Sequence, residues 1–181
     1  MTTNYKILAF EYLLTLLLRW YDEVSQDKNT SSFTRLKALK LLFFTTAVKN
    51  NDGKDLLDIF DNYYAMQNGP VESDIYNAIT RDQLTYYSFV NFSLEIKKEF
   101  DDNILDNSIR ERIVSSVNAL RKENKFIVNY DAGKLVDLSH MWLSWQNSIQ
   151  IAMVFGKGSY PMSVDMIRNN TQIFEIWDSS K

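Results

Sequence analysis

The sequence predicts an all-α protein: a single compact multi-helix domain over residues 1–181, with at most one small β-ribbon. Apolar residues recur at helical spacing in at least five segments, as is typical of amphipathic helices around a core. Glycine and proline number only 5 and 2, against about 13 and about 9 at average usage, which disfavours turn-rich sandwiches and barrels. Hydrophobic residues make up 45% of the chain, enough for one core at this length.

The first two helices follow from apolar spacing and from the polar residues between them. Residues 5–24 predict a long helix, because large apolar side chains recur at steps of four. The polar stretch 25–32 ends it, and a second helix is expected from about residue 33 to residue 48. We expect the basic residues of this second helix on its solvent side: Arg35, Lys37 and Lys40.

The middle of the chain is less regular. Residues 54–67 are short, aromatic and acidic, which fits either a helical turn or a small ribbon. Gly69-Pro70 predicts a tight turn, and a positive φ at Gly69 would make a β-branched residue there destabilising. Ser73 is expected to cap the helix that follows. Apolar spacing predicts a further helix over residues 82–100, although Phe89, Val90 and Phe92 raise the local strand propensity.

Capping residues mark the helices expected in the last third of the chain. Ser108 and Glu111 match a capping box, so a helix is expected to open there. Apolar residues at helical steps predict another helix over residues 131–145, and Ser163 is expected to cap a short one. Residues 172–177 fit no single element, and a ribbon is allowed there.

Charge and residue types exclude several functional classes. The net charge of -3 gives no global attraction for polyanions. The absence of cysteine excludes disulfides, thiolate metal sites and thiol nucleophiles, and a single histidine excludes two-histidine metal sites. Residues 138–156 carry no charge but contain polar side chains that lipid would not tolerate, so we expect a cytoplasmic protein without a membrane segment.

Three weaker patterns have ordinary structural explanations. An aspartate recurs every third residue from Asp52 to Asp61 without a calcium-binding loop, which predicts a solvated acidic face. His140 could act as a general base with Asp137 one helical turn away. However, no nucleophile or glycine-rich elbow accompanies it, so a structural or interface role is favoured. The basic residues are interleaved with acids, so we do not expect a nucleic-acid-binding face.

Three stretches, in order, resemble the Panacea domain, also called SocA-like, a mostly helical family of bacterial and phage antitoxins. Residues 37–44 (Lys-Ala-Leu-Lys-Leu-Leu-Phe-Phe) are similar to the family's Lys-Leu-Gln-Lys-Leu-Leu-Tyr-aromatic helix. Residues 53–56 and 64–71 (Tyr-Ala-Met-Gln-Asn-Gly-Pro-Val), followed by Tyr76, are similar to its Gly-Lys-Pro-Leu turn, Glu-Ala-Trp-x-x-Gly-Pro-Val and following Tyr. Leu138-Ser139-His140 with Trp145 is similar to its Leu-Thr-His-x-x-x-Pro-Trp. Departures from the pattern suggest a divergent member: Ala38, Leu39, Met66 and Ser144.

The resemblance implies a non-enzymatic antitoxin, without cofactor or metal, that neutralises a cognate toxin encoded nearby by direct protein–protein binding. Its motifs supply the candidate partner-binding residues: Lys37, Lys40, Phe43, Phe44, Gly69, Pro70, Val71, Tyr76, His140 and Trp145. The same residues can instead form the scaffold, because burial is the commoner fate of aromatic and aliphatic side chains. A phage- or prophage-associated regulatory protein that binds nucleic acid is the alternative, and a hydrolase using His140 is a third hypothesis.

Overall fold

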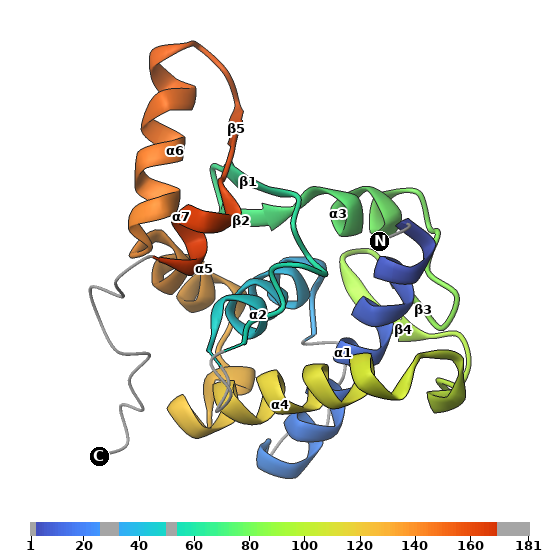
Figure 1. The fold of residues 1–181 in the computed structure, drawn as a ribbon. Coiled ribbons are helices and arrows are strands. Elements are labelled where there is room, and N and C mark those ends of the chain that lie inside the picture. Colours follow the sequence, from blue (N-terminus) through green and yellow to red (C-terminus); the bar gives the residue numbers. More distant parts are fainter. Residues whose placement is uncertain (1–2, 26–32, 50–53, 170–181) are drawn as a thin grey trace.

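Helices and two small antiparallel sheets make up the computed structural model, which describes residues 3–25, 33–49 and 54–169 (Figure 1). Strands account for 13% of the described residues and helices for 59%. The predicted all-α class is therefore wrong, and the fold is mixed α/β. The elements in chain order are α1 (Thr3–Val24), α2 (Arg35–Ala47), β1 (Tyr63–Met66), β2 (Gly69–Glu72), α3 (Ser73–Thr80), β3 (Tyr87–Val90), β4 (Ser93–Ile96), η2 (Asp102–Ile104), α4 (Asn107–Glu123), η3 (Ile127–Asn129), α5 (Ala132–His140), α6 (Leu143–Val154), β5 (Ser159–Pro161) and α7 (Val164–Arg168).

Helix α2 lies at the centre of the fold, and ten of its thirteen residues are buried. It contacts α4, α5 and strand β2, while α1 packs along α4 (Figure 1). The two helices predicted over residues 5–24 and 33–48 are confirmed as α1 and α2. The solvent-facing side predicted for α2 is wrong for Lys37 and Lys40, which are both buried because neighbouring elements cover α2 on several sides.

The three-stranded sheet forms one wall beside the amino-terminal half of α2. Its strand order is β2-β1-β5, with Met66 opposite Gly69 and Ala65 opposite Tyr160. Strand β1 lies within the segment for which a ribbon was one of two expectations. Gly69 has a φ of +92°, so the condition on which a β-branched residue there would be destabilising is met. The chain reversal lies two residues earlier than predicted, at Gln67-Asn68, because Gly69 already pairs with Met66.

The second sheet replaces a predicted helix. Residues 82–100 contain the hairpin of β3 and β4, in which Phe89 lies opposite Leu94. The apolar spacing that predicted a helix does not correspond to one buried face, because Leu84 is buried whereas Phe92 and Ile96 are exposed. The helical spacing of these apolar residues is therefore coincidental. A four-residue strand is too short for its alternating pattern to stand out against such spacing, even when aromatic and β-branched residues favour a strand.

Several helix boundaries also differ from those predicted. Asp106 precedes α4, so Ser108 lies inside the helix rather than capping it. Glu72, not Ser73, caps α3 through its side chain, whereas Ser163 caps α7 as predicted. The helix predicted over residues 131–145 is two helices, α5 and α6, separated where Trp142 adopts an extended conformation and inserts against the rings of Phe43 and Phe44. Residues 172–177 lie outside the described residues.

Candidate partner-binding groove

An apolar groove lies between the amino-terminal end of α2 and the two hairpins. Its volume is about 680 Å³, which falls within the range of ligand-binding clefts. We call it the α2 groove and define it by the residues that line it: Thr34, Arg35, Leu36, Leu39, Met66, Gln67, Asn68, Val71, Tyr76, Phe92, Ala132, Gly158 and Ser159.

The hairpin wall of the α2 groove is held from behind by side chains of α2 and α6. Lys40 Nζ donates a hydrogen bond to the Pro70 carbonyl oxygen over 2.6 Å. Trp145 Nε1 donates to the Met66 carbonyl oxygen over 3.0 Å, so both strands of the hairpin are tied to helices. A preformed wall of this kind lowers the conformational entropy that binding would otherwise have to remove.

Arg35 is the one lining residue that is charged at neutral pH. Its guanidinium lies 5.6 Å from the ring centre of Tyr76 and 5.4 Å from that of Phe92. Among the described residues, no carboxylate forms an ion pair with it. Arg35 is also the first residue of α2, where the helix dipole disfavours a cation. The groove therefore has an unneutralised positive charge at its mouth.

Phe92 forms an exposed lip of the same groove. It sits in the β3–β4 turn with a φ of +69°, next to Asn91 at +50°. A bulky aromatic residue disfavours this left-handed region, in which glycine or asparagine is usual. The Phe92 side chain is nevertheless 68% exposed, so burial in the core does not explain its presence. Its carbonyl oxygen accepts a hydrogen bond from the Arg35 backbone N–H over 2.9 Å, which fixes the turn against α2.

Two of the ten candidate partner-binding residues line the groove, namely Val71 and Tyr76. The others form its support or the core behind it. Phe43 and Phe44 are fully buried and pack on Trp142. Lys37 is buried with its ammonium near the rings of Tyr21 and Phe33, and burial lowers its pKa to about 8.

Gly69 marks the place where the second and third motifs meet. A Cβ added there would overlap Ser139 Oγ and lie 2.9 Å from Lys40 Nζ. Lys40 is completely buried, and this burial lowers its pKa to about 7. The close approach of strand β2 to α5 therefore requires glycine at this position. Residues from all three motifs thus lie together behind the hairpin.

His140 stacks on Trp145 with ring centres 3.8 Å apart and planes 7° from parallel. Burial and the nearby Lys40 lower its pKa, which keeps the imidazole neutral near pH 7. The His140 ring hydrogen-bonds to the Gln67 backbone, its Nε2 has no hydrogen-bond partner among the described residues, and Ser139 Oγ donates to the Val136 carbonyl oxygen. This arrangement orients Trp145 toward the hairpin and does not assemble a nucleophile with a base.

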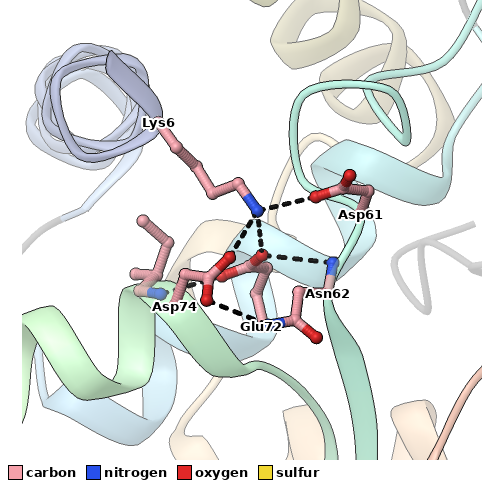
Figure 2. Close-up of polar contacts among 6 residues, drawn as sticks. Lys6, Asp61, Asn62, Glu72 and Asp74 are labelled. Atoms are coloured by element: carbon pink, nitrogen blue, oxygen red, sulfur yellow. Dashed lines mark hydrogen bonds and ion pairs between the residues drawn. The ribbon is translucent and has the colours of Figure 1, made fainter. Parts of the chain in front are cut away.

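A second polar cluster joins α1 to the other end of the same hairpin (Figure 2). Lys6 Nζ lies 2.7 Å from Asp61 Oδ1, 2.9 Å from Glu72 Oε1 and 2.6 Å from Asp74 Oδ2. Three converging carboxylates can hold a metal ion, but here the Lys6 ammonium lies among them. Burial opposes the charge on Lys6, yet its three carboxylate partners outweigh burial and raise its pKa. We assign this cluster a structural role.

The acidic face predicted from the aspartate repeat is only partly solvated. Asp55 is buried and accepts hydrogen bonds from Arg168, and Asp58 pairs with Arg112. Asp61 belongs to the cluster around Lys6, and Asp52 lies outside the described residues. The prediction is therefore wrong for Asp55, because an arginine far away in the sequence covers it.

Several basic side chains lie in ion pairs rather than on a free cationic surface. Arg112, Arg121 and Arg168 pair with Asp58, Glu23 and Asp55 respectively. Nucleic-acid binding depends on cations that are free to neutralise phosphates, so these pairs do not favour it. Within the described ranges, no helix is long and apolar enough to cross a membrane.

Sequence reasoning missed the two most distinctive groove residues, Arg35 and Phe92. The sequence predicts a solvent-facing cation at Arg35 and a helix around Phe92. The strand propensity of Phe89, Val90 and Phe92 was the signal that pointed to the hairpin, and Asn91, which is suited to a hairpin turn, could have strengthened it against the helical spacing. No family model, curated protein or solved structure matches the chain.

Proposed function

We propose that this protein is a cytoplasmic antitoxin-type protein, without enzymatic activity, that neutralises a cognate toxin encoded nearby by direct protein–protein binding. The observation that carries the proposal is the α2 groove, an apolar cleft with an exposed aromatic lip and one unpaired arginine. An exposed apolar cleft with these features is typical of a protein-interaction site. The three Panacea-like motifs, whose residues support the groove wall, add to this support.

The side chains at the groove mouth are of the types that dominate binding energy in protein complexes. Alanine scans find such energy concentrated in a few tryptophan, tyrosine and arginine residues, and Arg35, Tyr76 and Phe92 form an equivalent set. A stable complex buries about 800 Å² on each partner. The groove would therefore form the centre of a larger interface, with surrounding polar residues as its rim.

Neutralisation by binding requires stoichiometric amounts of the antitoxin. The test is co-expression with the adjacent gene product, followed by a growth assay and co-purification. We expect growth to be rescued only when a complex of fixed stoichiometry is recovered. His140→Ala should leave rescue intact in any folded preparation, because the His140 ring supports the scaffold. Rescue at substoichiometric levels without a detectable complex would contradict the proposal and favour an enzymatic mechanism.

The exposed phenylalanines offer a matched pair for locating the interface. Phe92 at the groove and Phe155 beyond the end of α6 are 68% and 66% exposed. Phe92→Ser should abolish co-purification, whereas Phe155→Ser should preserve it. The opposite pattern would move the interface to the end of α6 and away from the groove.

A further inference from the structure

The chemistry of the α2 groove restricts the kind of segment that it can accept. Leu36 and Met66, which are partly exposed, contribute apolar surface to the groove, and the buried side chains of Leu39 and Val71 also line it. These groups favour an apolar side chain, because burying it removes apolar surface from water on both partners. The cleft volume of about 680 Å³ is large enough for a bulky side chain together with part of its backbone.

The charge at the mouth of the groove selects a second feature of the partner. Arg35, like Arg19, Arg81 and Arg110, forms no ion pair with a carboxylate among the described residues, and of these four arginines only Arg35 lines the groove. The Arg35 guanidinium lies near the rings of Tyr76 and Phe92, and its N–H donors lie in the plane of the guanidinium. A carboxylate is the group that matches this fork of N–H donors.

The position of Arg35 at the start of α2 strengthens this preference. The guanidinium charge lies at the positive end of the helix dipole, so the two repel each other. A bound anion would be attracted to both and would offset this repulsion. Phe92 supplies an independent observation, because an exposed ring held at a φ of +69° is not explained by the packing of the fold. Both features become favourable if a partner segment covers the ring and neutralises the arginine.

We propose that the α2 groove binds a segment of the partner protein in which an apolar side chain lies next to an aspartate or glutamate. The apolar side chain occupies the cleft beside Leu39 and Val71, and the acidic side chain pairs with Arg35 beneath the ring of Phe92. This inference rests on the proposed function and identifies the chemistry of the segment that the partner contributes.

Two capped peptides that differ only in charge test the inference on the full-length protein. The probes are acetyl-Leu-Phe-Glu-amide and acetyl-Leu-Phe-Gln-amide, titrated while amide chemical shifts of the isotope-labelled protein are recorded. We expect saturable binding of the glutamate peptide with a Kd on the order of 1 mM, given its size. It should bind about fivefold more tightly than the glutamine peptide, as expected for a partly exposed charge-assisted pair. The shifts should centre on Leu39, Val71 and Phe92.

Arg35→Gln provides the decisive variant. It removes a cation from the unfavourable end of a helix, so the fold should be retained, and the spectrum of the variant checks this. The variant should bind both peptides equally, whereas Arg81→Gln, at an exposed arginine outside the groove, should keep the fivefold preference. Equal binding of the two peptides to the wild type, a preference that survives in Arg35→Gln, or no saturable binding would each overturn the inference.

Failure of this inference can be separated from failure of the proposed function. If a toxin co-purifies equally with the wild type and with Arg35→Gln, the antitoxin function is supported and the proposed acidic segment is contradicted. If the protein prefers the glutamate peptide but the neighbouring gene product is harmless, the preference of the groove for an acidic segment is supported and the antitoxin function is contradicted. A concentration-dependent dimer that Arg35→Gln dissociates would identify a second copy as the occupant and overturn the inference.

Discussion

Gly69→Ala would test the close packing of strand β2 against α5 that supports the groove wall. The variant has two separate effects. The φ of +92° disfavours any residue with a Cβ, by about 1–3 kcal/mol. The new Cβ would also overlap Ser139 Oγ and press on Lys40 Nζ at 2.9 Å, and overpacking of this kind costs about 1–3 kcal/mol. We therefore expect Gly69→Ala to lower the free energy of unfolding by about 2–6 kcal/mol.

A double-mutant cycle separates the overlap from the backbone effect. Ser139→Ala removes the overlapping oxygen and loses one hydrogen bond to Val136, which should cost about 1 kcal/mol. In the Ser139→Ala background, Gly69→Ala should be about 1–2 kcal/mol less destabilising than in the wild type, because the overlap is gone. Urea unfolding of the four proteins measures this coupling. Additivity within about 0.5 kcal/mol would show that β2 and α5 are not packed as described.

Three further substitutions have expected outcomes that urea unfolding can measure. Burial lowers the pKa of Lys40 from 10.5 to about 7. Between these two pH values the unfolded chain holds more protons than the folded one, so the free energy of unfolding should rise with pH. Lys40→Met should remove this contribution, which amounts to up to a few kcal/mol. A persistent full rise would contradict this. Lys6→Met leaves buried Glu72 without its cation, so we expect a loss of about 3–5 kcal/mol at pH 7. Part of the stability lost in Lys6→Met should return as pH falls and Glu72 becomes protonated. A loss of stability that does not change with pH would contradict this explanation. Phe92→Gly relieves the positive φ, so stability should stay level or rise by up to about 1 kcal/mol while partner binding weakens; a clear loss of stability would indicate that the ring is structural.

The long helices were predictable because their periodicity extends over several turns. Helix α1 buries residues from its first turn to its last, and its apolar spacing shows this directly. The four-residue strands β3 and β4 offer no comparable signal. Their turn also places Phe92 where glycine is usual, so the residue that normally marks such a hairpin is missing.

The burial of Lys37 and Lys40 could not be read from α2 alone. Charged residues at these positions ordinarily face water. Here the rings of Tyr21 and Phe33 lie over Lys37, and the β1–β2 hairpin covers Lys40. Lys40 reaches the Pro70 carbonyl thirty residues away, a contact that sequence spacing does not reveal. The same long-range packing makes Arg35 a groove residue, because Tyr76 and Phe92 come from two other elements.

The Panacea-like motifs located the support of the candidate site better than its surface. Gly69, Pro70, His140 and Trp145 hold the wall in place, as the scaffold hypothesis allowed. Of the side chains that would meet a partner, Arg35 and Phe92 lie outside the motifs, and Tyr76 belongs to the second one. Residues that pack a scaffold form recognisable patterns along the chain, whereas the residues of a binding surface are brought together only by the fold.

The most direct test of the account is the affinity of the purified adjacent gene product for three matched proteins: wild type, Phe92→Ser and Phe155→Ser. Isothermal titration calorimetry should give a stoichiometric complex with the wild type. The substitution at the groove should weaken binding by about 30-fold or more, as expected for an anchor residue, and the substitution beyond α6 should change it by less than about threefold. No binding to the wild type, or equal affinity of the two variants, would contradict the claim that this protein acts by holding a partner in the α2 groove.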